Sequence, residues 1–229
     1  MSEILDISGL EKIIEYSFKN SELLEQALTH SSYANERKIN RINDYERLEF
    51  LGDAVLELVS SDFLFHENPL LAEGKLTKLR SSMVCEPALA YCAREIGLEK
   101  YIRLGKGEEH TGGRERDSIV SDVMEAVIGA IYLDGGLENA HNFIHRFVLS
   151  DLENKTLFYD SKTVLQEIIQ ADGYDTFEYV LVGEKGPDHA KVFIVDAVLD
   201  GKPVGHGEGK NKKAAEQMAA YEAIKRLKK

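Results

Sequence analysis

Acidic side chains recur at helical spacing within one apolar stretch of the sequence, DYERLEFLGDAVLELV at residues 44–59. A helix turns by about 100° per residue, which places Glu46, Glu49 and Asp53 within about 60° of one another on a helical wheel. Apolar residues occupy the opposite side of the same wheel. Since only one face of a helix needs to be buried, a solvent-exposed acidic face is the simplest interpretation of this helix taken alone.

A second apolar segment, SDVMEAVIGAIYL, carries Asp122 and Glu125 three residues apart. Gly52 lies inside the first predicted helix and Gly129 inside the second, although an interior glycine costs a helix up to about 1 kcal/mol relative to alanine. Close approach of the two helices would account for both glycines. Such a crossing would bring four carboxylates together, those of Glu49, Asp53, Asp122 and Glu125.

A cluster of four carboxylates repels itself, and such groups do not stay ionised in a partly buried position without a counter-charge. No Lys or Arg shares these stripes at a suitable spacing. The donors are all oxygens, without Cys or His, which favours Mg²⁺ or Mn²⁺ over Zn²⁺. Mg²⁺ held by carboxylates, with substrate phosphate completing its shell, indicates phosphoryl-transfer or phosphodiester chemistry. With Glu46 added, the set could hold one or two ions, and the sequence leaves that number open.

Helical periodicity extends over most of the first part of the chain. The apolar spacing predicts helices in SGLEKIIEY, SELLEQALTH, GKLTKLRSSMV and EPALAYCAREIG, as well as in the two acidic segments. The segment RLGKGEEHTGGRERD, rich in glycine and charge, is predicted to be a mobile loop. Residues 1–152 are therefore predicted to form an all-α domain, followed by a linker at residues 153–160.

After residue 160 the pattern changes to that of a small α+β domain. KTVLQEIIQADG predicts one helix, and residues 176–209 alternate with period two around GPD and DGKP, which indicates three antiparallel strands. The final segment, NKKAAEQMAAYEAIKRLKK, predicts an Ala-rich amphipathic helix. The order α-β-β-β-α in residues 161–229 would let two helices cover one face of the sheet.

The composition is that of a globular protein without membrane segments. Of 229 residues, 43% are hydrophobic and 30% are charged, which suits one or two domains with a sizeable core. The start of the chain lacks the features of a signal peptide, and no apolar run is long enough to span a bilayer. Cys85 and Cys92 are interpreted as reduced core thiols rather than as a disulfide or a metal site. A cytoplasmic location is expected.

Charge is distributed unevenly along the chain. The formal net charge of −12, taken as a whole, argues against nucleic-acid binding. Residues 1–159, however, carry 17 Lys and Arg against 28 Asp and Glu, whereas residues 160–229 carry 11 against 12. The last predicted helix begins with Lys210, Lys212 and Lys213, and cations at a helix N-terminus oppose its dipole. A docked phosphate would offset that cost, so the lysines indicate an anion site; a solvated lysine run is the alternative.

The motifs resemble those of bacterial ribonuclease III, an endonuclease that cuts double-stranded RNA. The resemblance begins in LLEQALTHSSYANE, is most specific in ERLEFLGDAVL, and continues through EGKLTKLRSSMV to IRLGKGEEHTGGRERDSIVSDVMEAVIGAIYLDGG. The α-β-β-β-α segment resembles the double-stranded-RNA-binding domain that follows in the same family. The resemblance covers nearly the whole chain, and its signature is long and specific.

By this resemblance, the four carboxylates are the family's metal ligands, with Asp53 and Glu125 also acting in catalysis. Glu46 and Glu73 correspond to two further acids at the cleavage site, which help to position RNA or water. Phe50, an aromatic residue on the acidic side of its helix, corresponds to a contact in the homodimer. All six acidic positions are intact, which argues against a catalytically inactive relative.

Two further residues of these motifs are expected to have no catalytic role. Tyr45 stands where asparagine is commoner in the family, and it is expected to touch no metal ligand. His30, in LTHSS, is interpreted as a structural histidine near a helix end.

The resemblance also implies contacts with RNA in the second domain. The lysines of the last helix would contact phosphates across the major groove, while the first helix and the loop between strands one and two would reach successive minor grooves. The matching positions are Thr163, Gln166, Glu167, Gln170 and His189. Recognition would follow the A-form shape over about 16 base pairs. Without this pattern, His189 would be a surface histidine with no role.

The sequence thus predicts an Mg²⁺-dependent endoribonuclease, with Mn²⁺ as a substitute, that acts on double-stranded RNA as a homodimer and uses no organic cofactor. The resemblance implies 5′-phosphate and 3′-hydroxyl ends with a short 3′ overhang, in the processing of rRNA and mRNA. Two alternatives stay open. One is a double-stranded-RNA-binding protein that does not cleave, which would have no need of the carboxylates. The other is a phosphohydrolase of small nucleotides, which would leave duplex RNA intact.

Overall fold

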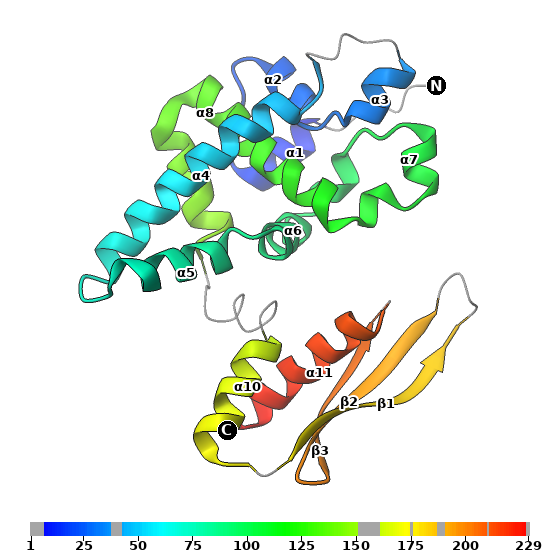
Figure 1. Cartoon of the computed structure of the whole chain (residues 1–229). Helices are drawn as coiled ribbons and strands as arrows, with labels where there is room; N and C mark the ends of the chain where they lie inside the picture. Colours follow the sequence, from blue (N-terminus) through cyan, green and yellow to red (C-terminus); the bar gives the residue numbers. More distant parts are fainter. Residues whose placement is uncertain are drawn as a thin grey trace. The chain divides into compact units, whose positions relative to one another are not determined.

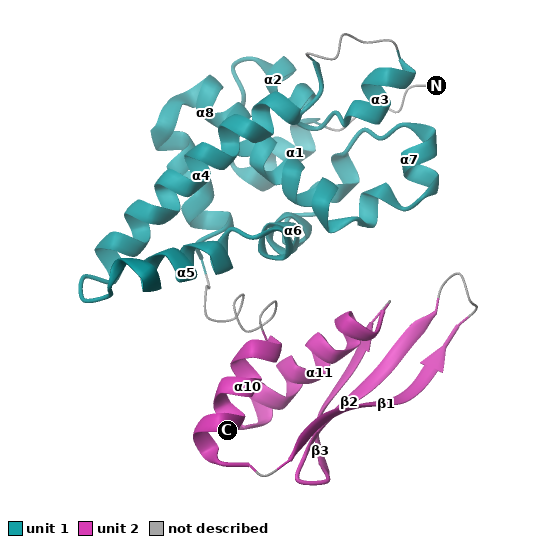
Figure 2. Cartoon of the chain, in the orientation of Figure 1, with its two compact units in different colours: residues 1–150 teal, residues 151–229 magenta. Residues whose placement is uncertain are grey.

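The computed structural model divides into two units, residues 1–150 and residues 151–229 (Figure 2). The first unit is helical, and the second combines a sheet with two helices. The residues that the structure describes are 7–37, 43–150, 161–174, 176–186, 191–209 and 211–227. Among them, no helix has both the length and the hydrophobicity to cross a membrane.

The first unit is built from helices (Figure 1). Within its described residues, the only extended pairing is an isolated bridge between Thr29 and Arg103. The α-helices are α1 (Ile7–Ile14), α2 (Ser21–Ala27), α3 (Ser31–Glu36), α4 (Glu46–Glu67), α5 (Glu73–Met83), α6 (Glu86–Glu95), α7 (Lys106–His110) and α8 (Asp117–Phe147). Two 3₁₀ helices, η2 (Leu98–Tyr101) and η3 (Gly113–Glu115), lie between α6 and α8. The all-α prediction for this part of the chain is confirmed.

Helices α4 and α8 cross at a pair of glycines. A Cβ atom added to Gly52 would stand 1.8 Å from the backbone oxygen of Glu125, and one added to Gly129 would stand 2.2 Å from that of Leu48. Neither position can hold a side chain without moving backbone. The predicted close approach is confirmed, and it places the backbone of Glu125 directly against α4.

Helix α8 bends at Gly136, whose φ of +80° and ψ of −180° are not helical. Just before the bend, the Asp134 carboxylate accepts hydrogen bonds from the Tyr16 hydroxyl at 2.6 Å and from the backbone N–H groups of Lys19 and Asn20 at 3.0 and 2.9 Å. These bonds tie the segment after α1 to α8.

The segment predicted to be a loop, residues 103–117, contains α7 and η3, so that prediction is wrong. Ion pairs within the segment hold these short helices. The Arg114 guanidinium donates to both carboxylate oxygens of Glu109, at 3.0 and 2.6 Å, and Arg116 pairs with Glu108 at 2.8 Å. Composition indicated a loop because the four glycines of the segment disfavour helix locally, whereas side-chain pairs stabilise these turns.

The second unit has the predicted α-β-β-β-α order. Its elements are α10 (Ser161–Asp172), β1 (Phe177–Lys185), β2 (Val192–Leu199), β3 (Lys202–Gly209) and α11 (Lys212–Leu227). The strands form one antiparallel sheet in the order β1-β2-β3. Both helices pack against the sheet through a core that includes Leu165, Val195 and Ile224.

The composition of α11 follows from how closely it lies on β3. A Cβ atom on Gly205 or Gly207 would come within 2.0 or 2.2 Å of backbone oxygens in α11. The helix meets these glycines with alanines, among them Ala215 and Ala219, which are fully buried. Small residues on both sides therefore allow helix and strand backbones to approach, and they leave the charged face of α11 in solvent.

Candidate metal centre and RNA-binding surfaces

Three carboxylates converge where α4 crosses α8. Glu49, Asp122 and Glu125 each offer one carboxylate oxygen, and these atoms lie within 4.8 Å of one another. Glu49 comes from the first turns of α4, whereas Asp122 and Glu125 stand on successive turns of α8. All three side chains are partly buried. The glycine contact sets this geometry, because it lets the two helix backbones meet beside the acids.

Two other predicted acids flank this group without belonging to it. Asp53 is exposed on α4, and its charge raises the pKa of both Glu49 and Glu125. Glu46 is exposed at the start of α4, and its charge also raises the pKa of Glu49. Both therefore lie near enough to act on a molecule bound at the three-carboxylate group.

The electrostatics of the group indicate a missing positive charge. Burial raises the pKa of Glu125 to about 8, and the charges of Asp53 and Glu49 contribute to that rise. Burial, followed by the charge of Asp122, raises the pKa of Glu49 to about 7. Burial also raises the pKa of Asp122. The ion pairs found among the described residues leave Glu49, Asp122 and Glu125 without a basic partner.

This donor set fits a hard divalent cation. Three carboxylate oxygens at close range, without nitrogen or sulfur, match the preference of Mg²⁺ and Mn²⁺ for oxygen ligands. A cation between them would also relieve the repulsion that raises their pKa values. Glu49, Asp122 and Glu125 are therefore the residues that would hold such an ion.

Tyr45 lies against this group, so the expectation that it touches no candidate ligand is wrong. Its hydroxyl donates a hydrogen bond to Asp122 Oδ2 at 3.3 Å, and its side chain is 4% exposed. Burial and the charge of Asp122 raise the pKa of Tyr45, so the hydroxyl keeps the proton that it donates. The signal was present in the sequence, because Tyr45 precedes Glu49 and Asp53 by four and eight residues, on the same helical stripe.

Glu73 lies away from the carboxylate group of its own chain. It is the first residue of α5, which follows the C-terminal end of α4 (Figure 1). Its side chain lines a pocket with Leu64 and Phe65 of α4. Phe65 is twelve residues beyond Asp53, which corresponds to roughly 18 Å along a helix axis. Any action of Glu73 at a carboxylate group would thus have to occur on a second copy of the chain.

Phe50 and His30 differ in how they are held. Phe50 is 80% exposed on α4, which suits the predicted dimer contact, and that contact stays a prediction. His30 caps α3, because its Nδ1 accepts a hydrogen bond from the backbone N–H of Ser32 at 3.1 Å. The structural role predicted for His30 is confirmed, and its ring also lies 5.6 Å from that of Tyr45.

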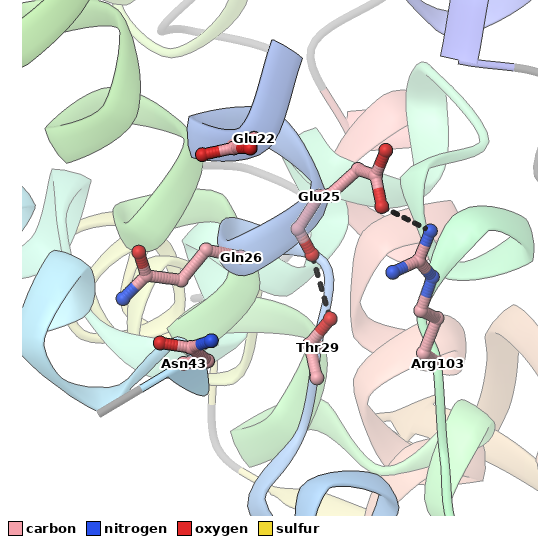
Figure 3. Close-up of a pocket in the computed structure, with 6 residues that line it drawn as sticks. All are labelled: Glu22, Glu25, Gln26, Thr29, Asn43 and Arg103. Carbon is pink, nitrogen blue, oxygen red and sulfur yellow. Dashed lines mark hydrogen bonds and ion pairs between the residues drawn. The ribbon is translucent and has the colours of Figure 1, made fainter. Parts of the chain in front are cut away.

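A separate pocket on the first unit contains none of the predicted site residues (Figure 3). Its lining residues are Glu22, Glu25, Gln26, Thr29, Asn43 and Arg103. Arg103 donates to the Glu25 carboxylate at 2.9 Å, and the Thr29 hydroxyl donates to the backbone oxygen of Glu25 at 2.6 Å. The charge of Arg103 is thus already balanced within the pocket wall.

The predicted RNA-binding residues that the structure describes lie on the surface of the second unit. One set shares the face of α10 turned away from the core, namely Thr163, Gln166, Glu167 and Gln170, all exposed. Lys212 and Lys213 are exposed in the first turn of α11. The Asn211 side chain caps that helix by accepting from the backbone N–H of Ala214 at 2.8 Å. His189 and Lys210 lie outside the described residues.

Comparisons with known families match both units. The model described as Ribonuclease-III-like matches residues 20–152, and the Double-stranded RNA binding motif matches residues 161–227. The chain thus combines a helical, ribonuclease-III-like unit that contains the carboxylate group with a double-stranded-RNA-binding motif that follows it in the sequence.

Curated relatives match the chain almost end to end. Ribonuclease 3 of Listeria monocytogenes serovar 1/2a is 47% identical over 220 residues, which is 95% of this chain and 96% of the relative. Ribonuclease 3 of Bacillus cereus strain AH187 is 49% identical over 217 residues, or 94% and 89% of the two chains. The solved nuclease domain of ribonuclease III from Campylobacter jejuni is 43% identical, with a TM-score of 0.59 over 62% of this chain and 96% of that one. The chain belongs to the ribonuclease III family.

Proposed function

We propose that this protein is a divalent-metal-dependent endoribonuclease that cleaves double-stranded RNA. The observation that carries the proposal is the convergence of Glu49, Asp122 and Glu125 in a chain that also contains a double-stranded-RNA-binding motif. A protein that only bound RNA would gain nothing from three carboxylates that repel one another in partial burial. The named relatives, each called Ribonuclease 3, support the same activity.

The chemistry follows from the positions of the acids. When bound, a cation such as Mg²⁺ or Mn²⁺ would lower the pKa of attacking water and stabilise charge on the phosphate and the leaving 3′ oxygen. Glu49, Asp122 and Glu125 would hold the ion, with Asp53 beside them as the fourth ligand that the family resemblance implies. Asp53 and Glu46, exposed beside them, would orient water or RNA through hydrogen bonds. We assign the most direct part in catalysis to Glu125, together with Asp53.

The second unit would supply the affinity for duplex RNA. Its exposed Lys212 and Lys213 stand at a helix N-terminus, where free N–H groups and cations both favour phosphate. The polar face of α10 would reach 2′-hydroxyls and base edges in the minor groove. Because the first unit is strongly acidic, binding would depend on these lysines and on the bound cation, and it would weaken as salt rises.

Several finer features belong to the same proposal. The products would carry 5′-phosphate and 3′-hydroxyl ends with a short 3′ overhang, and the substrates would include rRNA and mRNA precursors in the cytoplasm. The active form would be a homodimer with Phe50 in its interface, and each copy would provide one cleavage site. The related Campylobacter jejuni nuclease domain has a region involved in dimer formation. A second copy would then also supply Glu73 to each cleavage site, and the place of Glu73 near the C-terminal end of α4 supports this assignment.

The test is incubation of long duplex RNA with the full chain, with Mg²⁺, with Mn²⁺ and with a chelator. We expect cleavage that needs the metal and stops in Glu125→Gln, which removes a negative charge at nearly constant size. Binding of RNA by this variant in the absence of metal should be unchanged, because the binding surface lies in the second unit. Glu138→Gln is the matched control, since Glu138 is exposed on the same helix beyond its bend.

Two results would contradict the proposal. Duplex RNA that is shifted in a gel but stays intact with Mg²⁺ would indicate a binding protein without nuclease activity. Turnover of free nucleotides with duplex RNA untouched would indicate a small-molecule phosphohydrolase. Cleavage by Glu125→Gln at the wild-type rate would leave the activity in place and overturn the assignment of the centre.

A further inference from the structure

Tyr45 is held firmly from both sides of its backbone. Its N–H donates to the backbone oxygen of Thr29 at 2.9 Å, and its own backbone oxygen accepts from the N–H groups of Leu48 and Glu49 at 2.8 and 2.9 Å. Its side chain is buried, with the ring of His30 beside it. The hydroxyl therefore occupies a fixed place at the start of α4, from which it reaches across to Asp122 on α8.

The hydrogen bond restricts one candidate ligand of the metal centre. A carboxylate can rotate about its Cβ–Cγ bond, so an aspartate at a metal site needs an outer partner to fix the direction of its oxygens. Asp122 has such a partner in Tyr45, which approaches Oδ2. Tyr45 is a neutral donor, so it can direct the carboxylate without supplying the positive charge that a cation brings. A Lys or Arg in its place would compete with the ion.

The length of the bond limits what it contributes. At 3.3 Å it is longer than the usual O–H···O distance of about 2.5–3.0 Å, so it adds little to the stability of the fold. Its effect lies in orientation, which matters when Asp122 must present an oxygen together with Glu49 and Glu125. Removing the hydroxyl should therefore weaken metal binding more than it weakens folding.

We propose that Tyr45 is a positioning residue for the metal centre, which orients the carboxylate of Asp122 through its hydroxyl and so strengthens cation binding. The inference rests on the proposed function, because it takes the carboxylate group to be a cation site. The inference adds Tyr45 to the metal centre, although Tyr45 is not a carboxylate and would not itself bind the ion.

The experiment compares Tyr45→Phe with Tyr16→Phe in the metal-free full chain. Tyr16 also donates to an aspartate, Asp134, at 2.6 Å, but Asp134 lies nine residues beyond Glu125, about 14 Å along a helix axis. Mn²⁺ binding is followed by electron paramagnetic resonance of the free ion. Loss of an outer-shell partner typically costs 10–100-fold in metal affinity, and we expect about tenfold for Tyr45→Phe because its bond is long. Tyr16→Phe should bind Mn²⁺ as the wild type does.

A double-mutant cycle separates positioning from general damage. If Tyr45 acts through Asp122, Tyr45→Phe should change Mn²⁺ affinity little in an Asp122→Ala background, which has no acceptor for the hydroxyl, whereas a general distortion would weaken binding equally in both backgrounds. Wild-type Mn²⁺ affinity in Tyr45→Phe, or an equal loss in both backgrounds, would overturn the inference. If the wild type itself bound no Mn²⁺, both this inference and the proposed metal centre would fail. If the wild type bound Mn²⁺ and cut RNA but Tyr45→Phe matched it, only this inference would fail.

Discussion

The glycine contact between α4 and α8 yields a prediction whose size can be worked out from the structure. In Gly52→Ala, the new methyl group would start 1.8 Å from the backbone oxygen of Glu125, and ordinary contacts begin at 3.4 Å. The helices would have to separate by about the difference, roughly 1.6 Å, because backbone on both sides leaves no side chain to rotate away. The separation would displace Glu125, which is assigned the most direct part in catalysis.

Two opposing effects set the expected change in stability. Overpacking of a close-packed contact costs about 1–3 kcal/mol, and a clash between two backbones belongs at or above the top of that range. Alanine regains up to about 1 kcal/mol of helix propensity relative to glycine. The net loss in the free energy of unfolding is therefore about 2 kcal/mol or more. For a chain of this size it lowers Tm by roughly 4–8 °C.

Calorimetry of the metal-free full chain measures this shift, and Gly74→Ala is the matched control. Gly74 also lies in a helix, α5, but a Cβ atom there meets nothing within 4 Å, so its Tm should stay the same or rise slightly. Cleavage should also suffer in Gly52→Ala, since a misplacement of about 1 Å can cost 10²-fold in rate. A Gly52→Ala variant as stable as Gly74→Ala would refute the reasoning, because the helices would then not be in contact at this point.

Two further predictions concern charge. The pKa values of Glu49 and Glu125, about 7 and about 8, lie above their usual range, so the folded protein binds more protons than the unfolded chain between about pH 4.5 and 8. The stability of the metal-free protein should therefore fall as pH rises through that window, and Glu125→Gln should reduce the fall in thermal melts. A stability that rose with pH would contradict the burial of the acids. Replacing Lys212 and Lys213 by alanine should weaken duplex-RNA binding, as measured by fluorescence anisotropy. The slope of log affinity against log salt concentration should decrease in magnitude by about one for each phosphate that is no longer neutralised. An unchanged slope would show that these lysines do not bind phosphate.

Local patterns in the sequence determined much of the fold. Helical periodicity predicted α4 and α8, and alternation with period two predicted the three strands, because each pattern reflects which face of an element is buried. The interior glycines Gly52 and Gly129 predicted a helix crossing, since few other arrangements compensate their cost within a helix. The short helices in residues 103–117 were missed. Their stability comes from pairs such as Arg114 with Glu109, and composition does not register such geometry.

The sequence by itself determined which acids share a stripe, because the 3.6-residue period fixes the spacing of Glu49 and Asp53 within one helix. Only the tertiary structure decided which of them meet acids from α8. It brought carboxylate oxygens of Glu49, Asp122 and Glu125 within 4.8 Å of one another, and it left Asp53 exposed beside them, where its charge acts on Glu125. It also brought Tyr45 to Asp122, and it left Glu73, at the start of α5, beside the C-terminal end of α4. The physical reason is that the point where two helices cross depends on the packing of their backbones, and the period of a single helix carries no information about that point.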